Sequence, residues 1–161
     1  MQCASPSPES TRALGVALGR AADRGLAVAL LGSLGAGKTL FAQGVAEGLG
    51  LDPRGVQSPT FVIACEYPLP PRPAGGSLRR LVHADLYRLE RPEEAEAAGL
   101  RDWLGPDTLL LVEWADRAPE ALPDDRLEIR IGGGPEGRVL EIEARGAAAE
   151  AVLSRWRSMW L

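Results

Sequence analysis

The sequence contains little lysine, histidine or cysteine, and it has no long hydrophobic run. Its two cysteines, Cys3 and Cys65, are too few for a disulfide framework, and this usage is typical of a reducing compartment. No segment approaches the roughly 20 consecutive apolar residues that a membrane helix requires. The start of the chain, Met1 to Thr11, is polar and contains prolines, so we expect no secretory signal. These absences predict a cytoplasmic protein that makes no contact with a membrane.

The chain has 161 residues, of which 45% are hydrophobic and 25% charged, so it can bury a core. This length is that of one ordinary domain. We expect a single domain over residues 1–161, with a core at about 11–144 and a C-terminal helix at about 147–160. The net charge of −4 argues against a surface that attracts nucleic acid everywhere, but it leaves room for a local arginine patch. We also expect the chain to be monomeric on its own.

The shortage of lysine points to one residue. Of the 18 basic residues only Lys38 is a lysine, and the others are arginines. A chain that uses arginine so consistently is expected to retain lysine where a compact ammonium on a flexible stem is needed.

Hydrophobic patterns predict alternating strands and helices. Two continuous apolar runs, Leu26 to Leu31 and Thr108 to Glu113, are typical of strands buried on both faces of a parallel sheet. The spacing of apolar residues and the turn residues predict the other elements: helices over 10–24 and 38–49, a helix start at 92–94, strands over 59–67 and 81–87, and a β-hairpin around the glycine-rich segment 132–137. This order predicts a three-layer α/β fold with a mostly parallel sheet and an antiparallel hairpin at one edge.

Residues 32–39 read Gly-Ser-Leu-Gly-Ala-Gly-Lys-Thr and match the phosphate-binding loop (P-loop) pattern in full. Glycines let backbone N–H groups turn toward an anion, and the following helix directs its N-terminus at the same charge. In this pattern the lysine reaches the β- and γ-phosphates and the threonine hydroxyl binds Mg²⁺. We therefore predict a P-loop NTPase-like domain that binds a nucleoside triphosphate with Mg²⁺. The residues expected to hold the nucleotide are Gly35, Ala36, Gly37, Lys38, Thr39 and Leu40.

A P-loop needs an acidic partner, and two predicted strands end in one. We assign Glu113 to the metal, together with Thr39. Asp85 is our candidate for positioning the attacking water or the γ-phosphate, with Thr60 as a nearby switch-type hydroxyl and Lys38 as the third catalytic group. The alternative is that both acids are solvated strand ends and that Thr60 caps a strand.

Other polar and aromatic residues carry weaker signals. His83 is the only histidine, and its default role is that of a hydrogen-bonded structural residue. Trp114 follows Glu113, so alternation would turn it to the opposite face and into the core. Arg88 and Arg101 are candidate γ-phosphate contacts. The absence of an N-K-x-D segment removes the guanine-reading motif, so we expect ATP as the nucleotide.

At these residues the sequence resembles the bacterial TsaE (YjeE) family, small P-loop ATPases needed for the threonylcarbamoyl modification of adenosine in tRNA. The resemblance covers about residues 11–144. Its markers in chain order are the P-loop at 32–39, Ser-Pro-Thr-Phe at 58–61, Glu-Tyr at 66–67, His-x-Asp-Leu-Tyr-Arg-Leu at 83–89, Gly-Leu-Arg-Asp at 99–102 and Val-Glu-Trp at 112–114.

The resemblance implies roles and partners. Thr39 and Glu113 would bind Mg²⁺, Asp85 would be needed for hydrolysis, and Trp114 would lie near the nucleotide. Residues 58–61 would form a switch-like loop. The partners would be TsaB and TsaD, which place tRNA in indirect contact with this chain, and ATP turnover would be weak without them.

Two other functions stay open from the residues alone. A small-molecule kinase of this size would need an arginine-rich lid, whereas the candidate loop at 68–76 contains only Arg72. A non-hydrolysing module would instead use ATP binding to order residues 58–61 and so control a partner surface.

Overall fold

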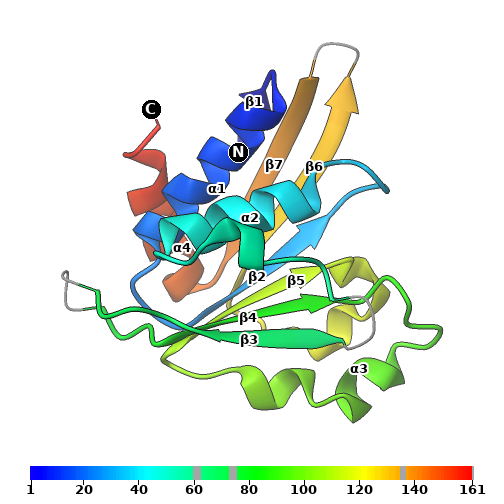
Figure 1. Cartoon of the computed structure of the whole chain (residues 1–161). Coiled ribbons are helices and arrows are strands. Elements are labelled where there is room, and N and C mark those ends of the chain that lie inside the picture. The colour runs from blue at the N-terminus through cyan, green and yellow to red at the C-terminus, as the bar shows by residue number, and fades with distance from the viewer. Residues whose placement is uncertain (60–62, 73–75, 135–136, 161) are drawn as a thin grey trace.

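The computed structural model describes residues 1–59, 63–72, 76–134 and 137–160. Within them the chain forms one seven-stranded sheet with helices on both faces (Figure 1). The helices are α1 (Pro8–Ala21), α2 (Lys38–Gly48), α3 (Glu93–Ala97) and α4 (Ala147–Arg157). The strands are β1 (Gln2–Ser5), β2 (Leu26–Leu31), β3 (Ala64–Pro68), β4 (Arg80–Asp85), β5 (Thr108–Glu113), β6 (Arg126–Gly134) and β7 (Gly137–Arg145).

The two apolar runs form the centre of the sheet, as predicted. The strand order is β1-β7-β6-β2-β5-β4-β3, and β2 pairs in parallel with both β5 and β6. Strand β4 runs parallel to β5, with Asp85 opposite Glu113 in the register. The carboxyl ends of these strands therefore meet at one edge, which is where open α/β sheets bind ligands.

Alternation along β2 divides the core into two layers, one on each face of the sheet. Leu26, Val28 and Leu30 pack in the cluster that also contains buried residues of α1, α2 and α4. Ala27 and Ala29 belong to the cluster on the other face, which the segment around α3 covers. This arrangement confirms the predicted three-layer α/β fold.

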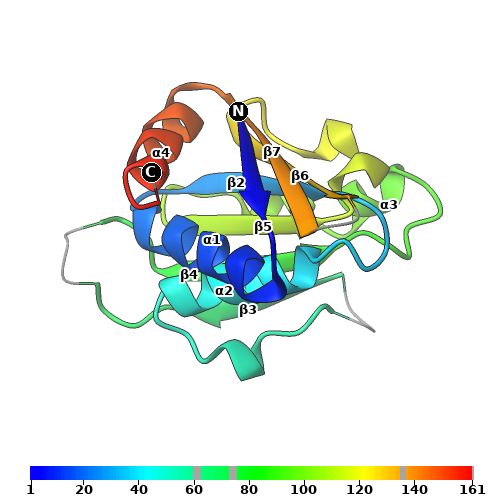
Figure 2. The same cartoon turned by 90° about the horizontal axis from the view of Figure 1, so that it is seen from above.

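The structure differs from the predictions mainly at the sheet edges. Strand β1, paired antiparallel with β7, was not predicted, because four residues offer too short a pattern to detect. It lies beside the hairpin strands at the end of the sheet away from β3 (Figure 2). Strand β3 is also antiparallel to its neighbour, so antiparallel pairs occur on both sides of the parallel centre.

Several element boundaries also shift. Helix α1 begins earlier than predicted because Ser7 caps it, accepting a hydrogen bond from the backbone N–H of Ser10, and it ends at Ala21. The strand predicted over 59–67 begins at Ala64, and its residues 60–62 lie outside the described part of the chain. The predicted hairpin forms, although β6 continues through Gly134 and β7 begins at Gly137, and the C-terminal helix ends at Arg157, earlier than predicted.

The C-terminal helix packs on the body of the protein. Trp156 of α4 is fully buried, and its indole N–H donates to the carbonyl of Leu14 in α1 at 3.0 Å. Within the described residues, none of the helices is long and apolar enough to cross a membrane.

Candidate functional site

The P-loop joins the end of β2 to the start of α2, as the sequence predicts. Gly32, Gly35 and Gly37 have φ angles of 140°, 75° and 108°, a region that residues with a side chain rarely adopt. Gly37 is the residue before the first turn of α2, and no side chain caps that turn. The N-terminal N–H groups of the helix are therefore available to an anion.

Lys38 is almost completely buried at the base of this loop. Its Nζ donates to the carbonyls of Gly32 and Ser33 at 2.6 and 2.9 Å, and it stands 3.9 Å above the centre of the Trp114 ring. Burial lowers the pKa of Lys38, while the nearby charges of Glu113 and Asp85 act in the opposite direction. The ammonium is thus held beside the loop by carbonyl oxygens and an aromatic face.

Glu113 is the centre of a buried polar cluster. Its carboxylate accepts hydrogen bonds from Thr39 Oγ1 at 3.0 Å and from Ser58 Oγ at 3.2 Å. His83 Nε2 lies 2.8 Å from Glu113 Oε1, and the hydroxyls of Thr39 and Ser58 are 2.9 Å apart. The cluster joins residues from α2, β4, β5 and the segment after η1 (Pro53–Gly55).

Asp85 lies next to this cluster at the end of β4. Its side chain accepts a hydrogen bond from the backbone N–H of Tyr87 at 2.9 Å and is half-buried. Burial raises the pKa of Asp85, and the negative charge of Glu113 adds to that effect, whereas the Tyr87 N–H opposes it.

Trp114 follows the end of β5 and contacts residues on two sides. Part of its side chain packs against the core cluster on the α3 face, as alternation predicts. Trp114 has a φ of 56°, the one positive φ found among the described residues other than glycine. This left-handed conformation ends the strand alternation, and the ring also lines the hollow beside the P-loop. There it contacts Lys38 and packs against Tyr87, with 4.8 Å between the ring centres.

These residues surround one hollow of about 350 Å³. The structure therefore brings together nearly all the residues that the sequence predicted for the site. Thr60 lies outside the described residues. The hollow is lined by Leu34, Gly35, Ala36, Gly37, Lys38, Thr39, Leu40, Ser58, Asp85, Tyr87, Glu113 and Trp114.

The donor set at this hollow fits Mg²⁺. Thr39 Oγ1 and Glu113 Oε2 are 3.0 Å apart, and Ser58 adds a second hydroxyl. Mg²⁺ prefers oxygen ligands and is usually held by one or two carboxylates together with substrate phosphates. In the parts of the chain that the structure describes, no group of three or more His, Cys, Asp or Glu side chains could hold a metal by itself.

Two arginines that the sequence analysis does not single out contact the P-loop or a residue that lines the hollow. Arg117 stands 5.3 Å from the Tyr87 ring centre, and Arg138 of β7 donates to carbonyls of the P-loop. Arg101 instead donates to the carbonyl of Glu120, and neither it nor Arg88 lines the hollow. The only sequence signal for Arg138 is its place directly after a glycine-rich turn.

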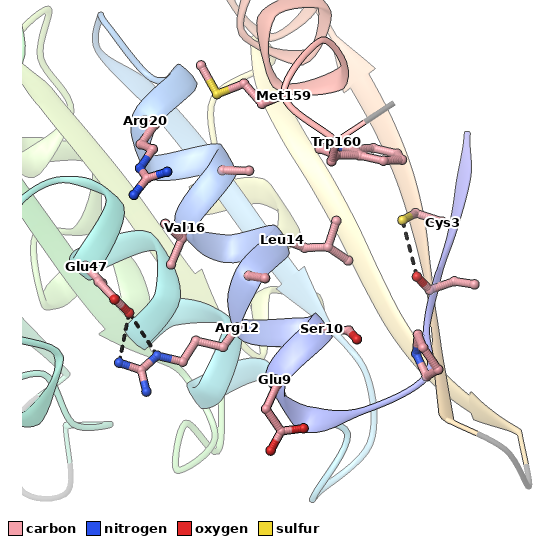
Figure 3. A pocket seen from close by; sticks show the side chains of 14 residues that line it. Cys3, Glu9, Ser10, Arg12, Leu14, Val16, Arg20, Glu47, Met159 and Trp160 are labelled. Atoms are coloured by element: carbon pink, nitrogen blue, oxygen red, sulfur yellow. Dashed lines mark hydrogen bonds and ion pairs between the residues drawn. The ribbon is translucent and has the colours of Figure 1, made fainter.

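A larger hollow, of about 890 Å³, lies elsewhere on the molecule (Figure 3). It is bounded by β1, α1 and the segment after α4, and Leu14 faces Trp160 across it. An ion pair between Arg12 and Glu47 lies at its rim. No residue of the P-loop lines this hollow, so size alone does not identify the nucleotide site.

Comparisons with known proteins identify related sequences and a related structure. The sequence model of the family described as "Threonylcarbamoyl adenosine biosynthesis protein TsaE" matches residues 5–139. The chain is 40% identical to the TsaE protein of Bacillus subtilis over 141 residues, which cover 87% of this chain and 83% of that one. It is 33% identical to the TsaE protein of Haemophilus influenzae, with 82% and 78% covered. The crystal structure of YdiB from Bacillus subtilis superposes with a TM-score of 0.72 and 32% identity, covering 99% of this chain and 95% of that chain.

Proposed function

Because the chain belongs to the TsaE family of tRNA threonylcarbamoyladenosine biosynthesis proteins, we propose that it is the accessory Mg-ATPase of that modification. The observation that carries this proposal is the convergence of Lys38, Thr39 and Glu113 on one hollow at the carboxyl edge of the sheet. In this proposal the protein is not itself the transferase.

The P-loop would bind the triphosphate. The N–H groups at the start of α2 have no side-chain cap and would face the phosphates, and Lys38 would exchange two carbonyl contacts for phosphate oxygens. Thr39 and Glu113 would hold Mg²⁺, which neutralises phosphate charge when bound. Ser58 and His83 would keep the Glu113 carboxylate in place, since both contact its Oε1.

Asp85 would serve hydrolysis. It lines the same hollow as Lys38 but is outside the Glu113 cluster, so its carboxylate remains available to orient a water. Trp114 and Tyr87 form an aromatic wall that would shield this water from the bulk solvent.

The partners in this proposal are TsaB and TsaD. They would stimulate ATP turnover, and tRNA would be reached only through them. The test is phosphate release from Mg-ATP by this chain alone and then with a matching TsaB–TsaD pair. A low rate alone and a large stimulation by the pair are expected. Lys38→Ala and Glu113→Ala should each abolish the stimulated rate, and retained stimulation in both variants would refute the proposal.

Two competing functions give different results in the same assay. Tight ATP binding without stimulation would indicate a non-hydrolysing, nucleotide-controlled module. Transfer of labelled γ-phosphate to a metabolite would indicate a kinase. The kinase is disfavoured because Arg72, the one arginine of the loop at 68–76, donates to the carbonyls of Ala22 and Gly19 at 2.8 and 3.2 Å. An arginine engaged at the end of α1 is poorly suited to a closing lid.

A further inference from the structure

Arg138 contacts P-loop carbonyls other than those that Lys38 contacts. Its Nε donates to the carbonyl of Ala36 at 3.1 Å, and its Nη2 donates to the carbonyl of Gly35 at 3.4 Å. It reaches the loop from β7, about a hundred residues further along the chain, and it does not line the hollow that holds Lys38 and Glu113. These are two consecutive carbonyls of the phosphate-binding segment.

Because the peptide unit is planar, a carbonyl that is held in place also fixes the direction of the N–H that follows it. In a trans peptide the carbonyl and the following N–H point in opposite directions, and no cis peptide occurs in the described residues. When Arg138 holds the Ala36 carbonyl, the N–H of Gly37 must point away from the hairpin. Arg138 therefore fixes the direction of a loop N–H group without touching an anion itself.

The loop needs such a restraint because its glycines permit many conformations. Gly35 and Gly37 have positive φ angles, and a side-chain atom added at Gly35 would meet nothing within 4 Å. The backbone freedom of these glycines allows the phosphate-binding conformation of the loop, but it also allows other loop conformations. A rigid guanidinium fork bonded to two neighbouring carbonyls selects one of them.

The glycine-rich hairpin provides the space for this contact. Gly133 lies opposite Arg138 in the β6–β7 register, and a Cβ at Gly133 would come within 3.0 Å of Arg138 Nη1. A Cβ at Gly137 would clash with Pro6, at 2.7 Å from its Cα. The glycines thus let the guanidinium lie across the strand and let the hairpin approach β1.

We propose that Arg138 is a positioning residue that holds the P-loop in its phosphate-binding conformation, a role that rests on the proposed ATP binding. Its absence should raise the Kd for Mg-ATP by about tenfold, the loss expected when charge-assisted hydrogen bonds are removed. It should also loosen the loop before any nucleotide binds.

The experiment compares Arg138→Gln with Arg145→Gln in the full chain. Arg145 lies on the same strand, has a side chain that is 46% exposed, and pairs with Glu128 and Glu143. Backbone ¹⁵N order parameters are measured without nucleotide, and Mg-ATP affinity is measured by calorimetry. The Arg138 variant should lower the order parameters of Gly35 to Gly37 below the about 0.85 of rigid backbone, and the Arg145 variant should not.

Two further variants separate positioning from charge. Gly133→Ala keeps Arg138 and crowds only its Nη1, which does not contact the P-loop, so it should change affinity and order less than Arg138→Gln does. Arg138→Lys keeps the charge without the fork, so it should not restore full affinity. Unchanged order parameters in Arg138→Gln would overturn the inference, even if affinity fell. If the wild-type chain bound no ATP, the proposed function would fail, and the order parameters would still decide the role of Arg138.

Discussion

Glu113 shows how a single residue joins the sheet to the P-loop. Its carboxylate is buried and is contacted by Thr39, Ser58 and His83. A buried carboxylate is stable only when donors replace its lost hydration. The same contacts fix its orientation, so the carboxylate is held in one direction at the edge of the hollow.

His83 should therefore stabilise the fold through Glu113. Replacing His83 by Leu leaves the buried carboxylate with one donor fewer, which should lower the free energy of unfolding by about 1–3 kcal/mol. His83→Gln is the matched control, because it retains a side-chain N–H. Urea denaturation of both variants gives the comparison. Equal losses in the two variants would show that packing of the ring matters and the hydrogen bond does not.

At the residue scale, the sequence predicts the neighbours of a side chain where a strict motif fixes them. It predicts them incompletely where the backbone leaves the regular strand conformation. The P-loop spacing predicts that Lys38 and Thr39 lie at one site, because each position has its own chemical demand, and both residues line the same hollow. Alternation accounts for the packing of Trp114 against the core on the α3 face but not for its contact with Lys38, because the rule assumes that the strand continues. Its left-handed backbone cannot be read from residue type alone, since tryptophan rarely adopts it.

At the scale of elements, glycines determine how closely α1 and α2 approach. A Cβ at Gly15 or Gly19 of α1 would lie 2.3 or 2.2 Å from a backbone oxygen of α2. Gly44 and Gly48 of α2 stand in the same relation to α1, at 2.3 and 2.2 Å. Because α2 begins at Lys38, its packing against α1 also fixes the position of the helix that follows the P-loop.

Gly19→Ala should separate these helices. Steric overpacking costs up to about 3 kcal/mol, and the better helix propensity of alanine returns about 1 kcal/mol, so a net loss of about 2 kcal/mol is expected. Gly55→Ala is the control, since an added Cβ there meets nothing within 4 Å. Chemical denaturation measures both. A Gly19 variant as stable as the Gly55 variant would contradict the close packing.

The junction of α1 and α4 predicts a dependence of stability on pH. The pKa of Asp23 is lowered by its hydrogen bond with Arg24 and by the charge of Arg155 in α4. A lowered pKa in the folded state gives a stabilisation that is present above the unfolded pKa, about 3.9, and is lost as pH falls through the folded value.

Asp23→Asn should remove that stabilisation. The wild type should exceed the variant in unfolding free energy at pH 7, by less than about 1 kcal/mol because the pair is partly exposed. The difference should shrink as the pH falls to about 3, below the unfolded pKa. Urea titrations at both pH values provide the measurement, and a difference that stayed constant with pH would rule out this ion pair as its source.

At the scale of the whole molecule, the sequence predicts the centre of the sheet better than its edges. Strands β2 and β5 match their predicted bounds because they are buried on both faces and read as continuous apolar runs. Strand β1 and the reach of Arg138 depend on contacts between distant parts of the chain. Such contacts leave no local pattern, so sequence periodicity could not indicate them.

Nucleotide binding should be visible as stability of the entire chain. A ligand that binds only the folded state stabilises it by about 2.7 kcal/mol at a concentration 100 times its Kd. For a domain of this size, that corresponds to a rise in Tm of roughly 5–10 °C. Mg-ATP should produce this rise, and Mg-GTP should produce less, since the sequence has no N-K-x-D segment.

Lys38→Ala distinguishes site binding from a general effect of the nucleotide. The variant should lose the rise in Tm, because no ammonium then faces the phosphates, whereas Arg145→Gln should keep it. Thermal denaturation with Mg-ATP, with Mg-GTP and with ATP plus a chelator separates the contributions of the base and of Mg²⁺ to the rise in Tm. A rise that survived in Lys38→Ala would place the nucleotide outside the P-loop. A rise unaffected by the chelator would instead remove Mg²⁺ from the site formed by Thr39 and Glu113.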